Sequence, residues 1–111
     1  MQFDPHSHLF TLIVHVVNAF LSSASEDNDI KAQIRSHIPP GSNVALAVVH
    51  GGAPTDSDIQ QAIAVAEKIY NIMQSLGREG FAFQRSSYFE PLFVLGQPSN
   101  YVAIDVYYFA S

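Results

Sequence analysis

The residues with the clearest capacity for chemistry are acidic and histidine side chains near the N-terminal end of the sequence. Asp4, His6 and His8 stand two residues apart, and His15 follows. Carboxylate and imidazole groups are ligands for zinc, nickel or copper, and an extended segment lets two such histidines chelate one ion. On a helix, however, His6 and His8 point about 200° apart and cannot share an ion. Because we expect a helix here, we interpret them as a solvent-facing polar stripe rather than a metal site.

A second candidate site is His50, which precedes Gly51 and Gly52 at the end of an expected inner strand. Open α/β sheets often place binding sites at the ends of their strands, and glycines before a capped helix are typical of phosphate-binding loops. The sequence GGAPTD contains neither GxGxxG nor GxxxxGK[ST], and its acidic residues near the helix start would repel a phosphate. We therefore interpret the glycines as a plain turn.

Nucleophilic catalysis has no recognisable signature in the chain. Serines are numerous and histidines number five, yet no GxSxG elbow is present. The sequence therefore predicts a non-enzymatic protein with no catalytic residues and no cofactor. A metal-dependent enzyme that uses Asp4, His6, His8 or His50 is a third, less favoured interpretation.

Composition narrows the possible partners. The 111 residues suit one domain, the charged content of 14% is well below the usual quarter, and the formal charge is −5. So few charges favour an oligomer that covers apolar surface with another subunit. The acidic balance argues against a DNA-binding surface, and the absence of cysteine excludes disulfides and thiolate metal sites. The apolar run from Leu9 to Leu21 is too short to cross a bilayer and lacks signal-peptide features, so we expect no membrane association.

The segment from about residue 5 to residue 23 is predicted to be an amphipathic helix. Asp4 and Pro5 suit the N-cap and the first helical position. Apolar side chains then recur at three- and four-residue steps from Leu9 to Leu21. Polar side chains take the opposite stripe, at His8, Thr11, His15, Asn18 and Ser22.

A short helix and an inner strand are predicted next. Ile30, Ile34 and Ile38 share one face of the short helix, which Pro39-Pro40-Gly41 ends. The strand over 43–50 has apolar residues in both of its alternating sets, which predicts that both faces are covered.

The remaining sequence is predicted to hold a helix over 59–76, extended segments over 81–96 and 101–109, and a turn over 97–100. Thr55 suits the helix N-cap and Gly77 the C-cap. Pro91 cannot donate a hydrogen bond to a neighbouring strand, so its strand is predicted to be an edge or to be bulged. We expect one α+β domain over 1–111: one twisted, mostly antiparallel sheet of about four strands, packed by two main helices and one short helix.

Aromatic residues gather in the last third of the sequence, where nine of the thirteen Phe and Tyr residues lie between Phe81 and Phe109. Asp105 stands among them, on the same alternating face as Tyr101, Tyr107 and Phe109. A lone buried carboxylate is costly, so Asp105 is predicted to pair with a basic group or to face solvent or a neighbouring subunit. Tyrosine and phenylalanine on an exposed strand favour a protein interface.

Three pieces of the sequence carry a resemblance to a known family. They are VALAVVHGGAPTDSDIQQAIAVAEKIYNIM, SSYFEPLFVLGQ and NYVAIDVYYF, and they lie within residues 44–109, a stretch of about 65 of the 111 residues. Their order resembles the C-terminal half of small phage tail terminator proteins, also described as minor capsid or head–tail joining proteins. Those proteins share a helix near the N-terminus, a twisted sheet, a helix after an inner strand, and final strands that complete the sheet. The interval before the inner strand departs from them, since it holds an acidic loop and a short helix instead of two or more strands.

The resemblance implies a virion protein that forms a ring, commonly a hexamer, on the end of the tail tube. Such a ring stops tube polymerisation and meets a head–tail connector or stopper protein, while DNA only passes through its lumen. The protein would be assembled in the host cytoplasm and located in the tail or neck. The runner-up is a small oligomeric binding protein, such as a phage-encoded inhibitor with a pocket between subunits. The candidate contacts with other subunits or the tail tube are Tyr88, Phe89, Phe93, Tyr101, Asp105 and Tyr107.

Overall fold

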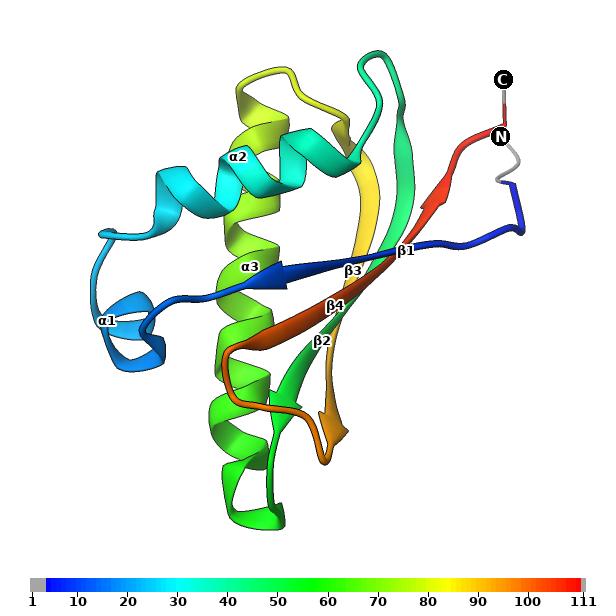
Figure 1. The fold of residues 1–111 in the computed structure, drawn as a ribbon. Coiled ribbons are helices and arrows are strands. Elements are labelled where there is room, and N and C mark those ends of the chain that lie inside the picture. Colours follow the sequence, from blue (N-terminus) through cyan, green and yellow to red (C-terminus); the bar gives the residue numbers. More distant parts are fainter. Residues whose placement is uncertain (1–3, 111) are drawn as a thin grey trace.

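A computed structural model describes residues 4–110 as three α-helices and a 3₁₀ turn on one four-stranded sheet (Figure 1). The expected α+β class is confirmed, with two helices of more than two turns and one short helix. In chain order the elements are β1 (His8–Ile13), α1 (Val17–Ser22), α2 (Asp27–His37), β2 (Val44–Ala53), the 3₁₀ turn η1 (Asp56–Asp58), α3 (Ile59–Arg78), β3 (Phe83–Leu95) and β4 (Tyr101–Tyr108).

The sheet is mixed, with the strand order β1-β4-β2-β3. β4 pairs antiparallel with both β1 and β2, whereas β2 and β3 are parallel and joined through α3. β3 and β4 therefore lie on opposite sides of β2, and the expected turn between two adjacent strands is instead a loop that crosses the end of β2. The prediction that the strand with Pro91 is an edge is confirmed, because β3 is the outermost strand beside β2.

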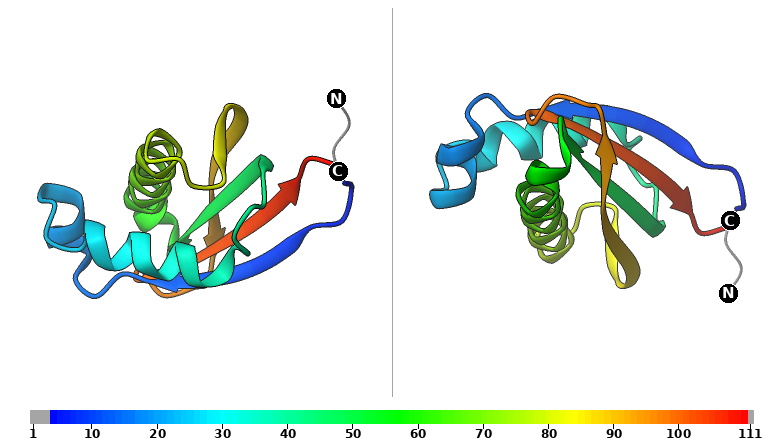
Figure 2. Two further views of the ribbon diagram at one scale, coloured as in Figure 1. Left: turned by 90° about the horizontal axis from the view of Figure 1, so that it is seen from above. Right: turned by 90° about the horizontal axis from the view of Figure 1, so that it is seen from below.

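One face of the sheet carries all the helices (Figure 2). α3 packs on β2 and β3, while α2 packs on β1 and α3. A single buried cluster joins this face of the sheet to the helices. Its members with no exposed area include Leu12, Phe20, Ile30, Ile34, Val49, Ile69, Met73, Leu76 and Ile104.

The predicted helix over residues 5–23 is wrong, because the segment is divided between strand β1 and the short helix α1. The run LFTLIV is apolar at both helical and strand spacing, so its periodicity supports either structure. The β-branched Thr11, Ile13 and Val14 favour the strand. Pairing with β4 then places Leu12 and Val14 in the core and leaves Ile13 45% exposed.

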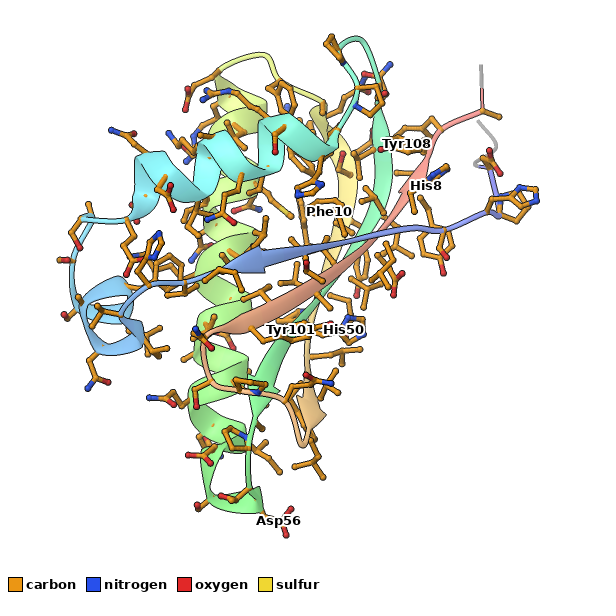
Figure 3. The ribbon with its side chains drawn as sticks, viewed as in Figure 1. His8, Phe10, His50, Asp56, Tyr101 and Tyr108 are labelled. Atoms are coloured by element: carbon orange, nitrogen blue, oxygen red, sulfur yellow. The ribbon has the colours of Figure 1, made fainter. Side chains whose placement is uncertain are left out.

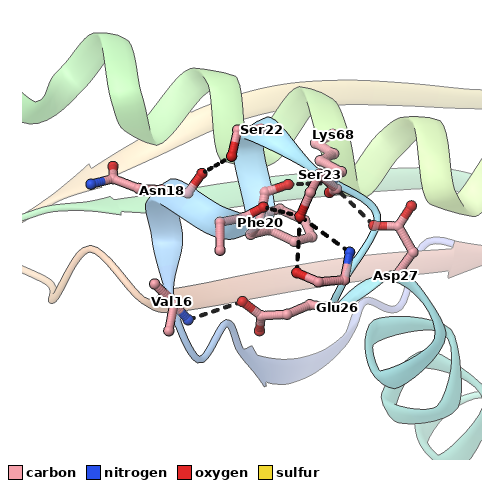
Figure 4. A network of polar contacts seen from close by, with 10 residues as sticks. Val16, Asn18, Phe20, Ser22, Ser23, Glu26, Asp27 and Lys68 are labelled. Atoms are coloured by element: carbon pink, nitrogen blue, oxygen red, sulfur yellow. Dashed lines mark hydrogen bonds and ion pairs between the residues drawn. The ribbon is translucent and has the colours of Figure 1, made fainter.

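A buried carboxylate holds the turn between β1 and α1. Glu26 is 8% exposed and accepts hydrogen bonds from the backbone N–H groups of His15 (2.6 Å) and Val16 (2.9 Å) at the start of α1 (Figure 4). At the other end of α1, Lys68 Nζ donates to the carbonyl oxygens of Phe20 and Ser23 and lies 4.3 Å from the centroid of the Phe20 ring. An anion at the N-terminus and a cation at the C-terminus match the helix dipole, which stabilises a helix of six residues.

The predictions for α2 and α3 are confirmed except at the two ends of α3. Ile30, Ile34 and Ile38 are buried. Thr55 was expected as the N-cap of α3, but it caps the preceding 3₁₀ turn η1 through a capping box with Asp58, and Asp58 is the N-cap residue of α3. Gly77 was expected as the C-cap but lies inside the helix, where a Cβ would be 2.3 Å from the Phe83 carbonyl oxygen. Helix α3 ends instead at Arg78, followed by Gly80 with a φ of +89°.

The predicted turn at Gly51-Gly52 is also wrong, since β2 continues through both residues to Ala53. A Cβ on Gly51 would lie 2.1 Å from the Ala62 carbonyl oxygen of α3. A Cβ on Gly52 would lie 1.9 Å from the Pro98 carbonyl oxygen, in the loop that crosses the end of β2. The glycines are therefore needed because backbone passes close to β2 on both sides.

Candidate functional site

The face of the sheet opposite the helices is the most distinctive surface of the described chain. His50 and Tyr101 lie on this side, away from α3 (Figure 3). We call it the open face, and the strand register assigns its members to cross-strand rows. The rows are Ile13 and Tyr101; Thr11, Ala103, His50 and Leu92; Leu9, Asp105, Val48 and Glu90; and Tyr107, Leu46 and Tyr88.

The open face is largely apolar although nothing in the described chain packs over its centre. Leu9 is 64% exposed, Tyr88 62% and Leu92 39%, while Leu46 and Val48 are half-buried by their strand neighbours alone. The prediction that both faces of β2 are covered is therefore wrong for this side of the sheet. An uncovered apolar patch of this kind is typical of a protein–protein contact.

Acidic groups occupy the centre of the open face. Asp105 is flanked by Leu9 and Val48, and its carboxylate makes no hydrogen bond or ion pair within residues 4–110. Glu90 is next to Val48 on β3 and accepts a hydrogen bond of 3.1 Å from the Tyr88 hydroxyl. That bond raises the pKa of Tyr88 above its usual value of 10.0, since losing the phenol proton would set two anions together. The rows contain no lysine or arginine.

Both edges of the sheet are partly blocked against further strands. On β1, the Gln33 side chain accepts a hydrogen bond from Ile13 N–H (3.0 Å) and donates one to Ile13 C=O (2.9 Å). Residues two apart on a strand point their backbone groups to the same side. The backbone N–H and C=O groups of Leu9 and Thr11 therefore point away from β4, as those of Ile13 do. On β3, Pro91 has no backbone N–H group, so this strand has one hydrogen-bond donor fewer. Strand pairing is thus limited at parts of both edges, whereas the open face is left uncovered by the described chain.

Four of the six residues predicted as contacts share the open face: Tyr88, Tyr101, Asp105 and Tyr107. Phe89 is 9% exposed and belongs to the core, while Phe93 pairs with Gly51 on the helix-covered side. The prediction missed Leu9, Ile13 and Leu92. Leu9 and Ile13 could not be identified while residues 5–23 were read as a helix.

The histidines are not brought together. His6 Nδ1 lies 2.7 Å from Asp4 Oδ1, and the hydrogen bond from His6 N–H is the main reason that the pKa of Asp4 is lowered. His50 Nδ1 is 3.3 Å from the Ala103 carbonyl oxygen, on the open face. Within residues 4–110, no three His, Asp or Glu side chains are close enough to hold a metal ion. In the same part of the chain, no helix is long and apolar enough to cross a membrane.

A groove of about 550 Å³ lies at the C-terminal end of α3, beside the start of β3. Its polar lining includes Asn43, Gln74, Gln84 and Ser87, and Phe83 and Phe89 form part of its floor. Arg78 and Arg85 also line it, and both are exposed. Neither arginine belongs to a recognisable motif, so the sequence alone gives no signal for them.

Comparison of the chain with protein families, curated proteins and solved structures finds no match. The likeness to tail terminator proteins therefore rests on the sequence patterns of residues 44–109. One structural finding departs from the family's pattern: strand β1 lies where a helix near the N-terminus is expected.

Proposed function

We propose that the protein is a non-enzymatic assembly protein that forms a homo-oligomeric ring, and that this ring caps a phage tail tube and joins it to the head. The observation that carries the proposal is the open face, an apolar and aromatic sheet surface that the chain leaves uncovered. Covering such a surface with another subunit removes apolar area from water, which contributes about 25 cal/mol for each Å².

Three further properties agree with this role. The low charge content suits a chain whose surface is largely shared with neighbours. The net charge of −5 would let DNA pass through a lumen without binding to it. The strand–helix order of residues 44–78 is the part of the tail terminator pattern that the fold retains.

Native mass spectrometry of the purified chain tests the ring directly. We expect one dominant species, at six times the mass of the chain, and ring-shaped particles in negative-stain images. Leu92→Glu, which places a charge on the open face, should shift the mass to that of the monomer. Asn71→Glu on the exposed surface of α3 is the matched control and should leave the ring intact. A wild-type chain that stays monomeric at high micromolar concentration would rule out the ring.

The role in the virion needs a separate test. If the ring forms, we expect the coding sequence to lie beside genes for a tail tube protein and head proteins. We also expect the purified ring to bind the end of that tube. A ring without affinity for the tube would retain the assembly and reject the tail function.

The second candidate function, a small oligomeric binding protein, is favoured by the groove at Arg78 and Arg85. Two exposed guanidinium groups with amide and hydroxyl neighbours suit a carboxylate or phosphate ligand. Thermal unfolding in the presence of inorganic phosphate, nucleotides and dicarboxylates tests it. A rise in Tm that Arg85→Ala removes would favour this function.

A further inference from the structure

The acidic centre of the open face limits what can pack against it. If two copies met open face to open face, Asp105 and Glu90 of one chain would approach the same carboxylates of the other. Like charges brought together away from water are strongly unfavourable, and Asp105 has no cation beside it to offset this. A symmetric sheet-on-sheet dimer is therefore disfavoured, and the surface that covers the open face should carry a cation.

The chain offers two cations for this purpose. Lys31 and Arg35 are both paired with Glu79, at 2.6 and 3.2 Å. Lys68 is held by α1 and lies 3.1 Å from Asp27. The two remaining basic residues, Arg78 and Arg85, make no ion pair with any residue in the part of the chain that the structure describes.

Arg78 and Arg85 also lie close together in the fold, in a groove whose lining residues Phe83 and Phe89 belong to the core on the helix-covered side of the sheet. Arg78 ends α3, Arg85 is near the start of β3, and both line the groove at this end of the molecule. Loop residues between them are exposed or half-buried, including Gly80 and Phe81. This end can therefore supply apolar contact as well as positive charge.

We propose that the Arg78–Arg85 end of each copy docks on the open face of the next copy, where the two arginines pair with Asp105 and Glu90. The inference rests on the ring of the proposed function and names its contact. Guanidinium and carboxylate groups form directional, often bidentate pairs, which would supply the cation that Asp105 lacks. Because the two surfaces are different, the contact is heterologous, and a heterologous contact generates a closed ring when its rotation closes.

Charge reversal on the two surfaces tests this contact. One variant carries Asp105→Arg with Glu90→Arg, and the other carries Arg78→Asp with Arg85→Asp. Each alone would oppose like charges at every contact, so the dissociation constant should rise by about 30-fold or more and native mass spectra should show monomers. An equimolar mixture restores opposite charges at every contact and should assemble again, with the two variants alternating around the ring.

The controls separate this contact from the ring itself. Glu67→Arg, on the exposed surface of α3, is a charge reversal outside both surfaces and should leave the ring intact. Circular dichroism confirms that each variant is folded; if the first variant is not, Glu90→Arg alone on the edge strand places one like-charge pair at every contact and should weaken the ring. A ring that survives both variants, or a mixture that does not reassemble, overturns the contact and leaves the ring standing. A monomeric wild-type chain overturns both.

Discussion

The two faces of the one sheet are built from the same strands but differ in what they contact. On β2, Ala47 and Val49 are fully buried under α3, while Leu46 and Val48 alternate with them on the open face and are only half-buried. On the covered face, both the side chains and the backbone of α3 pack against β2. The open face is apolar except for the carboxylates of Asp105 and Glu90 and the polar side chains beside them. The covered face therefore accounts for folding, and the open face is a surface that folding alone does not explain.

The largest effect should come from neighbouring residues on β1 that point to opposite faces. Leu12 has no exposed area, so Leu12→Ala removes buried methyl groups and leaves a cavity that should cost about 2–5 kcal/mol of unfolding free energy. Ile13 is 45% exposed, so Ile13→Ala should cost less than about 1 kcal/mol. Urea denaturation of both variants, at concentrations where the chain is monomeric, measures the difference. Equal losses would show that the two faces contribute alike to folding.

Close backbone approach on the covered face predicts the next effect. Gly51→Ala would place a Cβ 2.1 Å from a carbonyl oxygen of α3, and relieving that clash requires helix and strand to separate. We expect a loss of about 3 kcal/mol, at the upper end for overpacking. Gly41 has open space around it, so a Cβ there would meet no neighbour. Its φ of +82° is strained for alanine, and Gly41→Ala should lower the unfolding free energy by about 1 kcal/mol. Thermal unfolding of both variants checks the order, which the reverse ranking would contradict.

Sequence patterns were sufficient to predict an element where the apolar residues fit helical spacing or strand spacing, but not both. The three isoleucines of α2 and the long apolar stripe of α3 fit only a helix, and Tyr101–Tyr108 alternates as only a strand does. The first strand failed because LFTLIV is apolar at both spacings, and its pairing with β4 decides the outcome. The placement of β3 and β4 on opposite sides of β2 could not be predicted from local sequence either. It depends on Gly52, which leaves space for the loop at Pro98, 46 residues further along the chain.

The candidate site was only partly accessible for the same reason. The alternation of β4 was sufficient to place Tyr101, Asp105 and Tyr107 on one face. Which side of the sheet the helices cover is a tertiary property, so Phe89 could not be distinguished from Tyr88 as a core residue. Glu79 forms its ion pairs with Lys31 and Arg35 of α2 and not with the adjacent Arg78, which no sequence spacing indicates.

A charge on the open face should separate folding from assembly. Tyr88→Asp replaces a side chain that is 62% exposed, so the unfolding free energy of the monomer should change by no more than about 0.5 kcal/mol. The same change removes an aromatic ring from the apolar surface that assembly would bury, and this loss of contact should weaken self-association. Size-exclusion chromatography with light scattering, beside urea denaturation, measures both quantities on one sample. A variant that unfolds readily would show that the open face is needed for the fold as well.

The smallest effect on stability should come from the exposed ion pairs of Glu79. This residue follows α3 and pairs with Lys31 and Arg35 of α2. The hydrogen bond from Lys31 is the main cause that lowers the pKa of Glu79 below its usual 4.5. A carboxylate whose pKa is lowered by folding stabilises the protein above the unfolded pKa, and this contribution is lost as the pH falls through the folded pKa. The Tm difference between the wild type and Glu79→Gln should therefore be small at neutral pH and vanish once the pH has fallen below the lowered pKa of the folded state. Lys31→Met should abolish the same pH dependence, because it removes the group that holds the pKa down; a Tm difference that persists in acid would assign the effect to packing instead.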